Sequence, residues 1–460
     1  MVTTTIPGLN SRQLLGQLKR VQSDTLGFLM DCVKTYGDLV SFQAGPTTAV
    51  FVNQPEGVRH ILQDNARNYS KDTVQYNALS SITGRGLLTS DGDLWFRQRR
   101  LEQPAFSRPR LAALDTFVVP AVQRLLDHWE THLPTRQSID VDQHMMQVTL
   151  EIVGKALFSI DLSSQAPALT SAVLTTLDHI VHRARNPISL PAFLPTRRNL
   201  RFRAALSTLD AAVYDLMAAR QEAGDPGDDM LGMLMKARDE ETGQPMSERQ
   251  VRDEVITLLI AGHETVASAL TWTFHLLAAN PDARQRLENE VHSVLGGRLP
   301  TTADLPNLPY TGWVFSEALR LYPPAWLITR KALAEDQISG HTLAPGTLII
   351  LSPYVLQRAP AYWPEPERFL PERFEPSTEK ARPRYAYIPF GGGPRLCIGS
   401  NFAQIEAQLI LALVAQRFRL ESDASAAVVA DPLVTIRPRG GLHMTLSRSQ
   451  PEPTPAEAAV

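Results

Sequence analysis

The stretch that most constrains this 460-residue chain is FGGGPRLCIG, at residues 390–399, which a helical apolar pattern follows up to about residue 417. Three consecutive glycines allow the backbone to approach another group closely. Cys397 stands where that helix begins, so backbone amides and the positive end of the helix dipole favour its thiolate over its thiol. The sequence therefore predicts a single reactive or metal-binding sulfur on a tight loop in front of a helix.

The number of cysteines limits what Cys397 can do. Cys32 is the only other cysteine, so a disulfide scaffold and a metal site with four sulfur ligands are both excluded. Haem iron, in contrast, needs only one axial sulfur from the protein. Gly399 would leave room for a flat macrocycle, and Arg395 would supply a cation for a carboxylate at the edge of that macrocycle.

The same loop has three other interpretations. A lone cysteine is most often a small buried apolar residue. Clustered glycines also form phosphate-binding loops, but no Gly-Lys-Ser/Thr follows them here. A cysteine hydrolase would need a histidine base, whose position the sequence does not identify.

The ten residues match the haem-binding signature of the cytochrome P450 family, Phe-x-x-Gly-x-Arg-x-Cys-x-Gly, at every fixed position. The resemblance implies a mainly α fold with a smaller β-rich region, in which haem b lies between a long central helix and the helix after the cysteine loop. It implies that the Cys397 thiolate is the axial ligand of the iron. It also implies cofactor contacts for Phe390, Gly393, Arg395 and Gly399.

Two further segments resemble the parts of the family that contact the haem propionates. Trp95 and Arg99 stand four residues apart, so on a helix they share one face. Spacing alone is equally typical of an aromatic residue packed beside a surface arginine. The Trp-x-x-x-Arg resemblance assigns both residues to cofactor binding, and a looser resemblance on a predicted strand adds Arg330.

Glu317 and Arg320 stand three residues apart on a predicted helix and can form an ion pair. Most such pairs are solvated and contribute little. Here they match the family motif Glu-x-x-Arg, and the segment 371–374 resembles the one whose arginine, Arg373, completes a buried cluster. The resemblance implies that these three residues fix the segment that carries the cysteine loop. One departure is Gln357, where many relatives have histidine.

An apolar helical stretch at residues 258–265 carries a glycine, an acid and a hydroxyl in succession. Gly262 weakens a helix, and the hydroxyl of Thr265 can bond back to a carbonyl and bend it. A kinked core helix with an exposed Glu264 is one interpretation. The stretch is similar to the oxygen-activation motif of the family, which implies that Ala261 and Gly262 border the haem, that Thr265 donates a hydrogen bond to the oxygen being activated, and that Glu264 relays protons from solvent. His263 is expected to face away.

Substrate contacts are expected by family position at mostly apolar residues, namely Tyr76, Leu79, Ile82, Leu258, Ala261, Trp326, Leu327, Ile328 and Val434. A lipophilic substrate follows, such as a terpenoid, carotenoid, steroid or fatty acid. Residues 72–90 are rich in Gly and Ser, which predicts a long irregular lid over this pocket.

We expect residues 1–446 to form a single haem domain. Its β-rich portions are predicted at about residues 36–54, 325–355 and 430–446, and its helical bulk at about 94–322 and 398–417. The tail at residues 447–460 is expected to be disordered.

The 45 basic and 48 acidic residues nearly balance, giving a formal charge of −3, so no nucleic-acid partner is expected. The first 20 residues hold no apolar run long enough for a signal peptide or a membrane span. We therefore expect a cytoplasmic monomer without a membrane anchor.

No flavin or dinucleotide fingerprint is visible, so electrons must come from another protein. The resemblance implies a monooxygenase that uses O₂ and a ferredoxin or flavodoxin with an NAD(P)H-dependent reductase, so that NAD(P)H acts only indirectly. Arg97 and Arg100 are candidates for docking an acidic carrier. The alternatives are a haem-thiolate isomerase, dehydratase or peroxygenase, which would not need the relay of Glu264 and Thr265, and a non-enzymatic haem-binding sensor, in which the relay and the thiolate would be idle.

Overall fold

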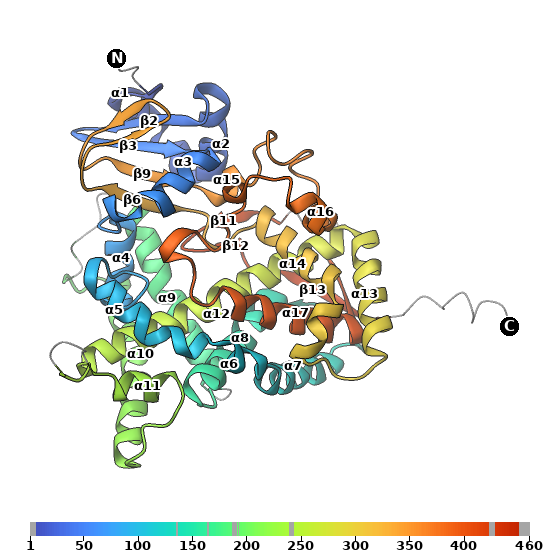
Figure 1. The fold of residues 1–460 in the computed structure, drawn as a ribbon. Helices are drawn as coiled ribbons and strands as arrows, with labels where there is room; N and C mark the ends of the chain where they lie inside the picture. The colour runs from blue at the N-terminus through green and yellow to red at the C-terminus, as the bar shows by residue number, and fades with distance from the viewer. Residues whose placement is uncertain are drawn as a thin grey trace.

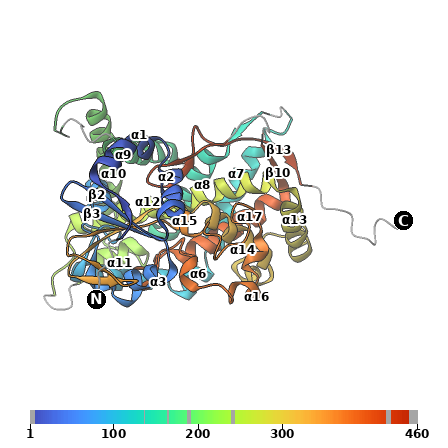
Figure 2. The same ribbon diagram turned by 90° about the horizontal axis from the view of Figure 1, so that it is seen from above.

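The structure is a computed structural model that describes residues 6–134, 137–162, 165–185, 191, 193–238, 243–422 and 428–449. Helices form most of it, and a smaller sheet-rich region lies at one end, beside the N-terminus (Figure 1). The long helix α12, Glu248–Ala279, runs through the middle of the helical region in both views (Figure 1 and Figure 2). The predicted fold class, mainly α with a smaller β-rich region, is confirmed.

The other helices are distributed along the whole chain, and several of the short ones begin with proline in their first turn. They are α1 Ser11–Ser23, α2 Thr25–Tyr36, α3 Pro55–Arg59, α4 Val74–Thr83, α5 Gly92–Glu102, α6 Arg108–Ala112, α7 Asp115–Glu130, α8 Val141–Phe158, α9 Ala166–Arg185, α10 Arg197–Glu222, α11 Met230–Lys236, α13 Pro281–Leu295, α14 Pro309–Leu321, α15 Pro353–Leu356, α16 Pro376–Glu379 and α17 Ser400–Arg417.

The strands are short and gather mainly at the two ends of the chain. They are β1 Gly8–Leu9, β2 Leu39–Ala44, β3 Thr47–Val52, β4 Tyr69–Ser70, β5 Ile139–Asp140, β6 Ile328–Ala332, β7 Asp336–Ile338, β8 His341–Leu343, β9 Leu348–Leu351, β10 Phe418–Ser422, β11 Ala430–Pro432, β12 Ile436–Pro438 and β13 His443–Arg448. Ser447 and Arg448 thus belong to a strand rather than to the predicted tail, and residues 450–460 lie outside the described residues.

The β-rich portion predicted at about residues 36–54 forms a hairpin in the largest sheet. β2 and β3 pair antiparallel from Leu39 opposite Val52 to Ala44 opposite Thr47, around a turn in which Gly45 adopts a φ of +59°. β3 then pairs parallel with β9, and the sheet order is β1-β2-β3-β9-β6-β4. This order brings the strands that follow α14 beside the hairpin, although nearly 300 residues separate them in the sequence.

The prediction of an irregular lid over residues 72–90 is wrong for its first half, which forms α4. Tyr76, Leu79 and Ile82 recur every third residue and are buried in the main core. Ser, Asn and Thr residues between them have modest helix propensity, so packing rather than local preference stabilises this helix. The irregular parts are the two residues before α4 and the segment from Gly84 to Asp91.

α12 is the central element of the main core and packs most extensively against α8. Of the described helices, it is the one with the length and mean hydropathy to cross a membrane, and 78% of its most apolar window is buried inside the protein. Trp272, near its C-terminal end, stacks on Tyr322 with ring centroids 3.8 Å apart and donates from its indole nitrogen to the Ile436 carbonyl at 3.0 Å. Trp272 thus joins the helical core to the last strands.

Replacing Trp272 by alanine should lower the free energy of unfolding by about 3–5 kcal/mol, because it removes a fully buried aromatic ring and leaves a cavity. Urea denaturation followed by circular dichroism measures this change. Phe193→Ala is the control, since that ring is 76% exposed, and its effect should stay within about 0.5 kcal/mol. Equal effects of the two substitutions would contradict the role of Trp272.

Candidate functional site

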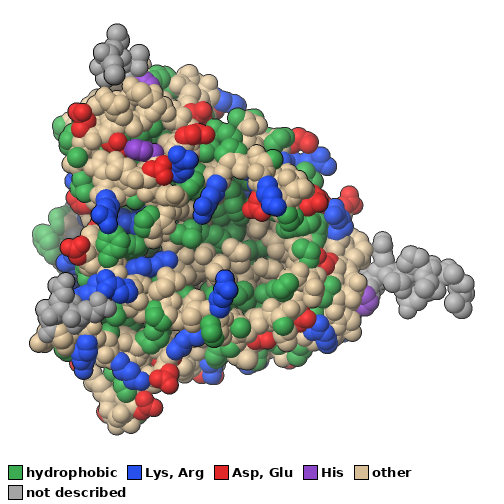
Figure 3. Space-filling view, viewed as in Figure 1, with side chains coloured by type: hydrophobic (Ala, Val, Ile, Leu, Met, Phe, Trp, Pro, Cys, Tyr) green, Lys and Arg blue, Asp and Glu red, His purple; other side chains and the backbone are tan. Residues whose placement is uncertain are grey.

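The loop that carries Cys397 is closed by its own backbone, because the Cys397 N–H donates to the Phe390 carbonyl at 3.0 Å. Cys397 is accessible to solvent, although protein atoms surround its thiol on most sides. Figure 3 shows a face of the molecule that is hollowed near its centre, where apolar side chains gather. The geometry thus presents one sulfur at an internal surface.

The ionisation of Cys397 differs from the expectation. Burial raises the pKa of the Cys397 thiol, and the opposing effects of the Gly399 amide and the Arg99 guanidinium are smaller. The helix terminus alone therefore does not hold a thiolate. A metal cation deprotonates a coordinating thiol outright, so the position fits a sulfur whose charge is balanced by iron.

The glycines of the loop are present for different structural reasons. Gly393 has a φ of +65°, and a Cβ there would lie 1.8 Å from the Leu62 carbonyl oxygen, so packing against residues 60–64 requires glycine. The cofactor contact that the resemblance implies for Gly393 stays a prediction beside this packing role. A Cβ at Gly399 would meet only Phe106, at 3.8 Å, so protein packing leaves space there for a flat macrocycle.

Trp95, Arg99 and Arg395, which the sequence assigned to cofactor binding, come together at the start of the cysteine loop. The Arg395 guanidinium lies 4.7 Å from the centroid of the buried Trp95 ring and pairs with Asp91. Arg99 donates to the Leu396 carbonyl at 2.9 Å. Two cations and an indole donor thus border the loop that carries the sulfur.

Arg330 and Lys71 extend this group of cations. Arg330 donates to the Tyr76 hydroxyl at 3.1 Å, so Tyr76 points toward the cations rather than only into the predicted substrate pocket. The Lys71 Nζ donates to the Leu88 carbonyl at 2.8 Å and lies 5.3 Å from the Tyr76 ring. Burial, and then the charges of Arg330 and Arg395, lower the pKa of Lys71.

We call Lys71, Arg99, Arg330 and Arg395 the cation cluster. Asp91 is the acidic residue whose negative charge acts on Lys71 against the positive charges of the cluster. Buried charges need compensation, so this excess of positive charge fits the two propionate carboxylates of haem b. Sequence reasoning missed Lys71, because no periodic pattern or motif marks a single lysine between a short strand and α4.

The central stretch of α12 exposes one face and buries the other. Ala261 and Thr265 are partly accessible, and the Thr265 hydroxyl donates to the Ala261 carbonyl at 2.7 Å. The helix stays continuous there. A Cβ on Gly262 would lie 3.0 Å from Val153, so glycine permits close packing against α8 here, and its contact with the cofactor stays a prediction. His263 faces the same core, as expected, and burial lowers its pKa to about 4.

Glu264 is buried (3% exposed) and does not project into solvent. Its carboxylate accepts a hydrogen bond from the Thr435 hydroxyl at 2.8 Å. Burial raises the pKa of Glu264 to about 7, while Arg437 and Thr435 act in the opposite direction. Glu264 therefore exchanges its proton near neutral pH. Sequence reasoning missed Thr435, which lies 171 residues further along the chain.

The residues predicted to contact substrate are divided among three apolar clusters. Tyr76, Leu79, Ile82 and Leu258 belong to the main core and Val434 packs against it, whereas Ile328 belongs to the cluster of the large sheet and Trp326 and Leu327 to that of the N-terminal helices. The indole of Trp326 donates to the Leu433 carbonyl at 2.9 Å. The Gln75 amide of α4 donates to the Leu327 carbonyl at 3.1 Å, so the structure brings the Trp326–Ile328 segment beside both α4 and the Val434 segment.

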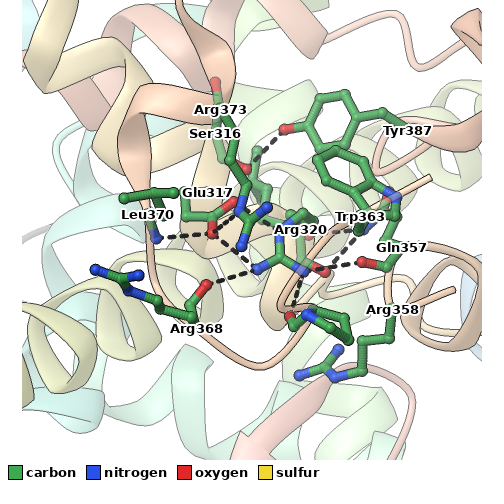
Figure 4. Close-up of polar contacts among 12 residues, drawn as sticks. Ser316, Glu317, Arg320, Gln357, Arg358, Trp363, Arg368, Leu370, Arg373 and Tyr387 are labelled. Atoms are coloured by element: carbon green, nitrogen blue, oxygen red, sulfur yellow. Dashed lines mark hydrogen bonds and ion pairs between the residues drawn. The ribbon is translucent and has the colours of Figure 1, made fainter. Parts of the chain in front are cut away.

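Glu317 and Arg320 form a bidentate ion pair that is fully buried, with N···O distances of 2.6 and 2.7 Å (Figure 4). Arg373 lies 3.3 Å from the same carboxylate. The remaining N–H groups of Arg320 donate to the carbonyls of Gln357, Pro366 and Arg368. The pair therefore holds the irregular segment that leads to the cysteine loop, as the resemblance implied.

Gln357 extends this network. Its amide nitrogen donates to the last-turn carbonyls of Leu319 and Arg320, at 3.1 and 3.0 Å. Its amide oxygen accepts from the Ile388 N–H at 2.9 Å. This buried glutamine thus ties the end of α14 to the chain nine residues before the sulfur, and the departure from histidine leaves no unsatisfied group.

Residues 6–442 match the family model described as Cytochrome P450, so the chain belongs to this family of haem-thiolate monooxygenases. It is 41% identical over 423 residues to cyclooctatin synthase from Streptomyces melanosporofaciens, covering 91% of this chain and 89% of that one. It is 35% identical to pentalenene oxygenase from Streptomyces avermitilis, covering 92% and 93%. The crystal structure of the cytochrome P450DA heme domain matches 98% of this chain and 99% of its own with a TM-score of 0.88 at 25% identity.

Family membership settles the cofactor and the class of reaction. The enzyme binds haem with a cysteine thiolate ligand and oxidises lipophilic substrates with O₂ and electrons from redox partners. Within the described residues, Cys397 is the cysteine whose loop, hollow and neighbouring cations fit that group.

Replacing Glu317 by alanine should yield protein without haem, because Arg320 and Arg373 would keep buried charges without a carboxylate. Removing one partner of a buried pair costs about 3–5 kcal/mol. The haem content per chain of the purified protein, with the free energy of unfolding, measures the effect. Arg368→Ala is the control, because the side chain of Arg368 is 60% exposed. Normal haem content in Glu317→Ala would refute the role of the pair.

Proposed function

We propose that this enzyme inserts one oxygen atom from O₂ into a cyclic terpenoid hydrocarbon or one of its alcohols. The observation that carries the proposal is the 41% identity with cyclooctatin synthase. Two further relatives support it, cyclooctat-9-en-7-ol 5-monooxygenase at 36% identity and pentalenene oxygenase at 35%. The apolar side chains of α4 and α12 suit such a substrate, since they offer few hydrogen-bonding groups.

The bound haem thiolate supplies an electron-rich iron that favours cleavage of the O–O bond. The chain must hold the cofactor, exclude water and deliver protons. We assign the cation cluster and Trp95 to binding the propionates and Cys397 to binding the iron. Gly399, which has no side chain, would leave room for the ring. Phe390 supports the cofactor by closing the sulfur loop.

Proton delivery is assigned to Glu264 and Thr265. The Thr265 hydroxyl lies on the accessible face of α12 and can exchange its bond to the Ala261 carbonyl for one to a bound ligand. Glu264, held by Thr435, stores the proton. Its burial means that a side-chain rotation or an ordered water must connect it to the accessible face.

Electron delivery is assigned to a ferredoxin or flavodoxin that docks on the exposed side of α5, where Arg97 and Arg100 lie, with an NAD(P)H-dependent reductase behind it. We also infer a cytoplasmic monomer. Because basic and acidic residues nearly balance over the whole chain, an acidic carrier would be attracted by a local group of positive charges and not by the net charge of the protein.

A titration of the purified holoenzyme with terpenoid hydrocarbons tests the substrate class. A fitting compound should convert the iron from low to high spin, which absorption spectroscopy reports, and a straight-chain fatty acid of similar size should give a much smaller shift. A stronger response to fatty acids than to every cyclic terpenoid would refute the proposed substrate.

Product formed per electron should depend on pH through Glu264. The raised pKa of about 7 means that Glu264 holds its proton below that pH and loses it above, so coupling should fall as the pH rises through about 7. Thr435→Val removes a hydrogen bond that favours the ionised form, so it should move the midpoint upward.

Glu264→Gln should abolish this pH dependence, and Thr265→Ala should lower coupling by about tenfold or more at every pH, since general acid catalysis contributes about 10²–10⁴-fold. Product and consumed NAD(P)H are measured together. Unchanged coupling in Thr265→Ala would contradict the assignment of that hydroxyl.

A further inference from the structure

Two glutamates meet in the interior where α5 ends. Glu102, the last residue of α5, and Glu254, on α12, are both fully buried (0% exposed). Their carboxyl groups lie within hydrogen-bonding reach of each other. Two adjacent carboxyl groups in a medium of low polarity cannot both be ionised. At least one proton must therefore lie between them.

The surrounding donors decide which glutamate keeps the proton. One Glu254 oxygen accepts from the Gln250 amide and the other from the Leu87 N–H, both at 2.8 Å. No donor among the described residues reaches either oxygen of Glu102. An ionised carboxylate accepts hydrogen bonds, whereas a protonated one needs an acceptor. Glu254 is therefore the carboxylate, and Glu102 is the acid that donates to it.

The segment from Gly84 to Asp91 connects this pair to the cation cluster. At one end, the Arg85 N–H donates to Asp253 at 2.9 Å, next to the Leu87 contact with Glu254. At the other end, the segment contacts Lys71 and Arg395 of the cation cluster, through the Leu88 carbonyl and the Asp91 carboxylate. The pair, the segment and the cation cluster thus form one continuous polar network.

We propose that Glu102 is a positioning residue, protonated in the working enzyme, whose hydrogen bond to Glu254 ties α5 to α12. α5 carries Trp95 and Arg99, so the bond fixes those side chains against the sulfur loop and slows the loss of haem. The inference rests on the proposed contacts of Trp95 and Arg99 with the cofactor. It is independent of the identity of the substrate.

The charges around the pair set the direction of its pH dependence. Burial and the neighbouring Glu254 raise the pKa of Glu102, and Arg99 opposes this. Burial also raises the pKa of Glu254, with a smaller contribution from Asp253. Helix α11, which packs against α5, buries apolar side chains, and the side chain of its Lys236 is 49% exposed.

A carboxyl whose pKa is raised in the folded state stabilises the fold at low pH and loses that contribution as the pH rises from its ordinary value through the raised value. Haem should therefore leave the enzyme faster in alkaline solution, when Glu102 loses its proton beside the Glu254 carboxylate.

Transfer of haem from the holoenzyme to excess apomyoglobin, without substrate or electrons, measures this loss across the pH range. Wild-type enzyme should lose haem about tenfold faster at alkaline than at neutral pH, the rate ratio expected if roughly one hydrogen bond to a charged group is lost. Glu102→Gln should match the wild type at neutral pH and lack the alkaline acceleration, because its amide donates at every pH. Glu102→Leu should be fast throughout.

Infrared spectra of the holoenzyme provide a second readout. The difference between wild type and Glu102→Gln should show one protonated carboxyl band at neutral pH, whereas Asp93→Asn, on the exposed side of α5, should remove none. The proposal is overturned if Glu102→Gln keeps the wild-type pH profile or if no such band disappears. If Glu102→Leu does not fold, the pH profile of haem loss in Glu102→Gln and the infrared carboxyl band still test the proposal. A negative substrate titration would leave these results unaffected, so the two proposals fail separately.

Discussion

The ion pair between Glu317 and Arg320 is the interaction on which the position of the sulfur depends. Both side chains are shielded from water, and every N–H of Arg320 is used, either by the carboxylate or by backbone carbonyls of the irregular segment before the cysteine loop. Desolvating these charges is costly, so the arrangement is stable only when all partners are present. A segment without regular secondary structure thereby acquires one fixed path, and Cys397 inherits its position from that path.

Sequence motifs were sufficient to identify residues where function needs a particular residue type at a fixed spacing. Cys397 and the Glu317–Arg320 pair were identified in this way, and the pair has the predicted geometry. The β-rich portion that contains the hairpin at residues 39–52 was also predictable, because β-strand and turn residues are local signals. Local signals failed for α4, whose helical structure depends on packing of Tyr76 and its neighbours against the rest of the core.

Contacts between distant parts of the chain explain the features of the site that the sequence did not predict. Glycine is required at Gly393 because of Leu62, more than 300 residues away, and at Gly262 it allows close approach to Val153 on another helix. A sequence shows that a glycine is present but not which neighbour demands it. For the same reason, the motif around Glu264 did not reveal that this side chain is buried against Thr435.

Gln357 replaces a side chain that would titrate near neutral pH with one that has no proton to exchange. The link from the last turn of α14 to Ile388 consequently carries the same charge and the same three hydrogen bonds in mildly acidic and in neutral solution. Acidification that would add a buried positive charge to a histidine at this position leaves the glutamine unaffected. The anchoring of the sulfur loop is, at this contact, tolerant of acid.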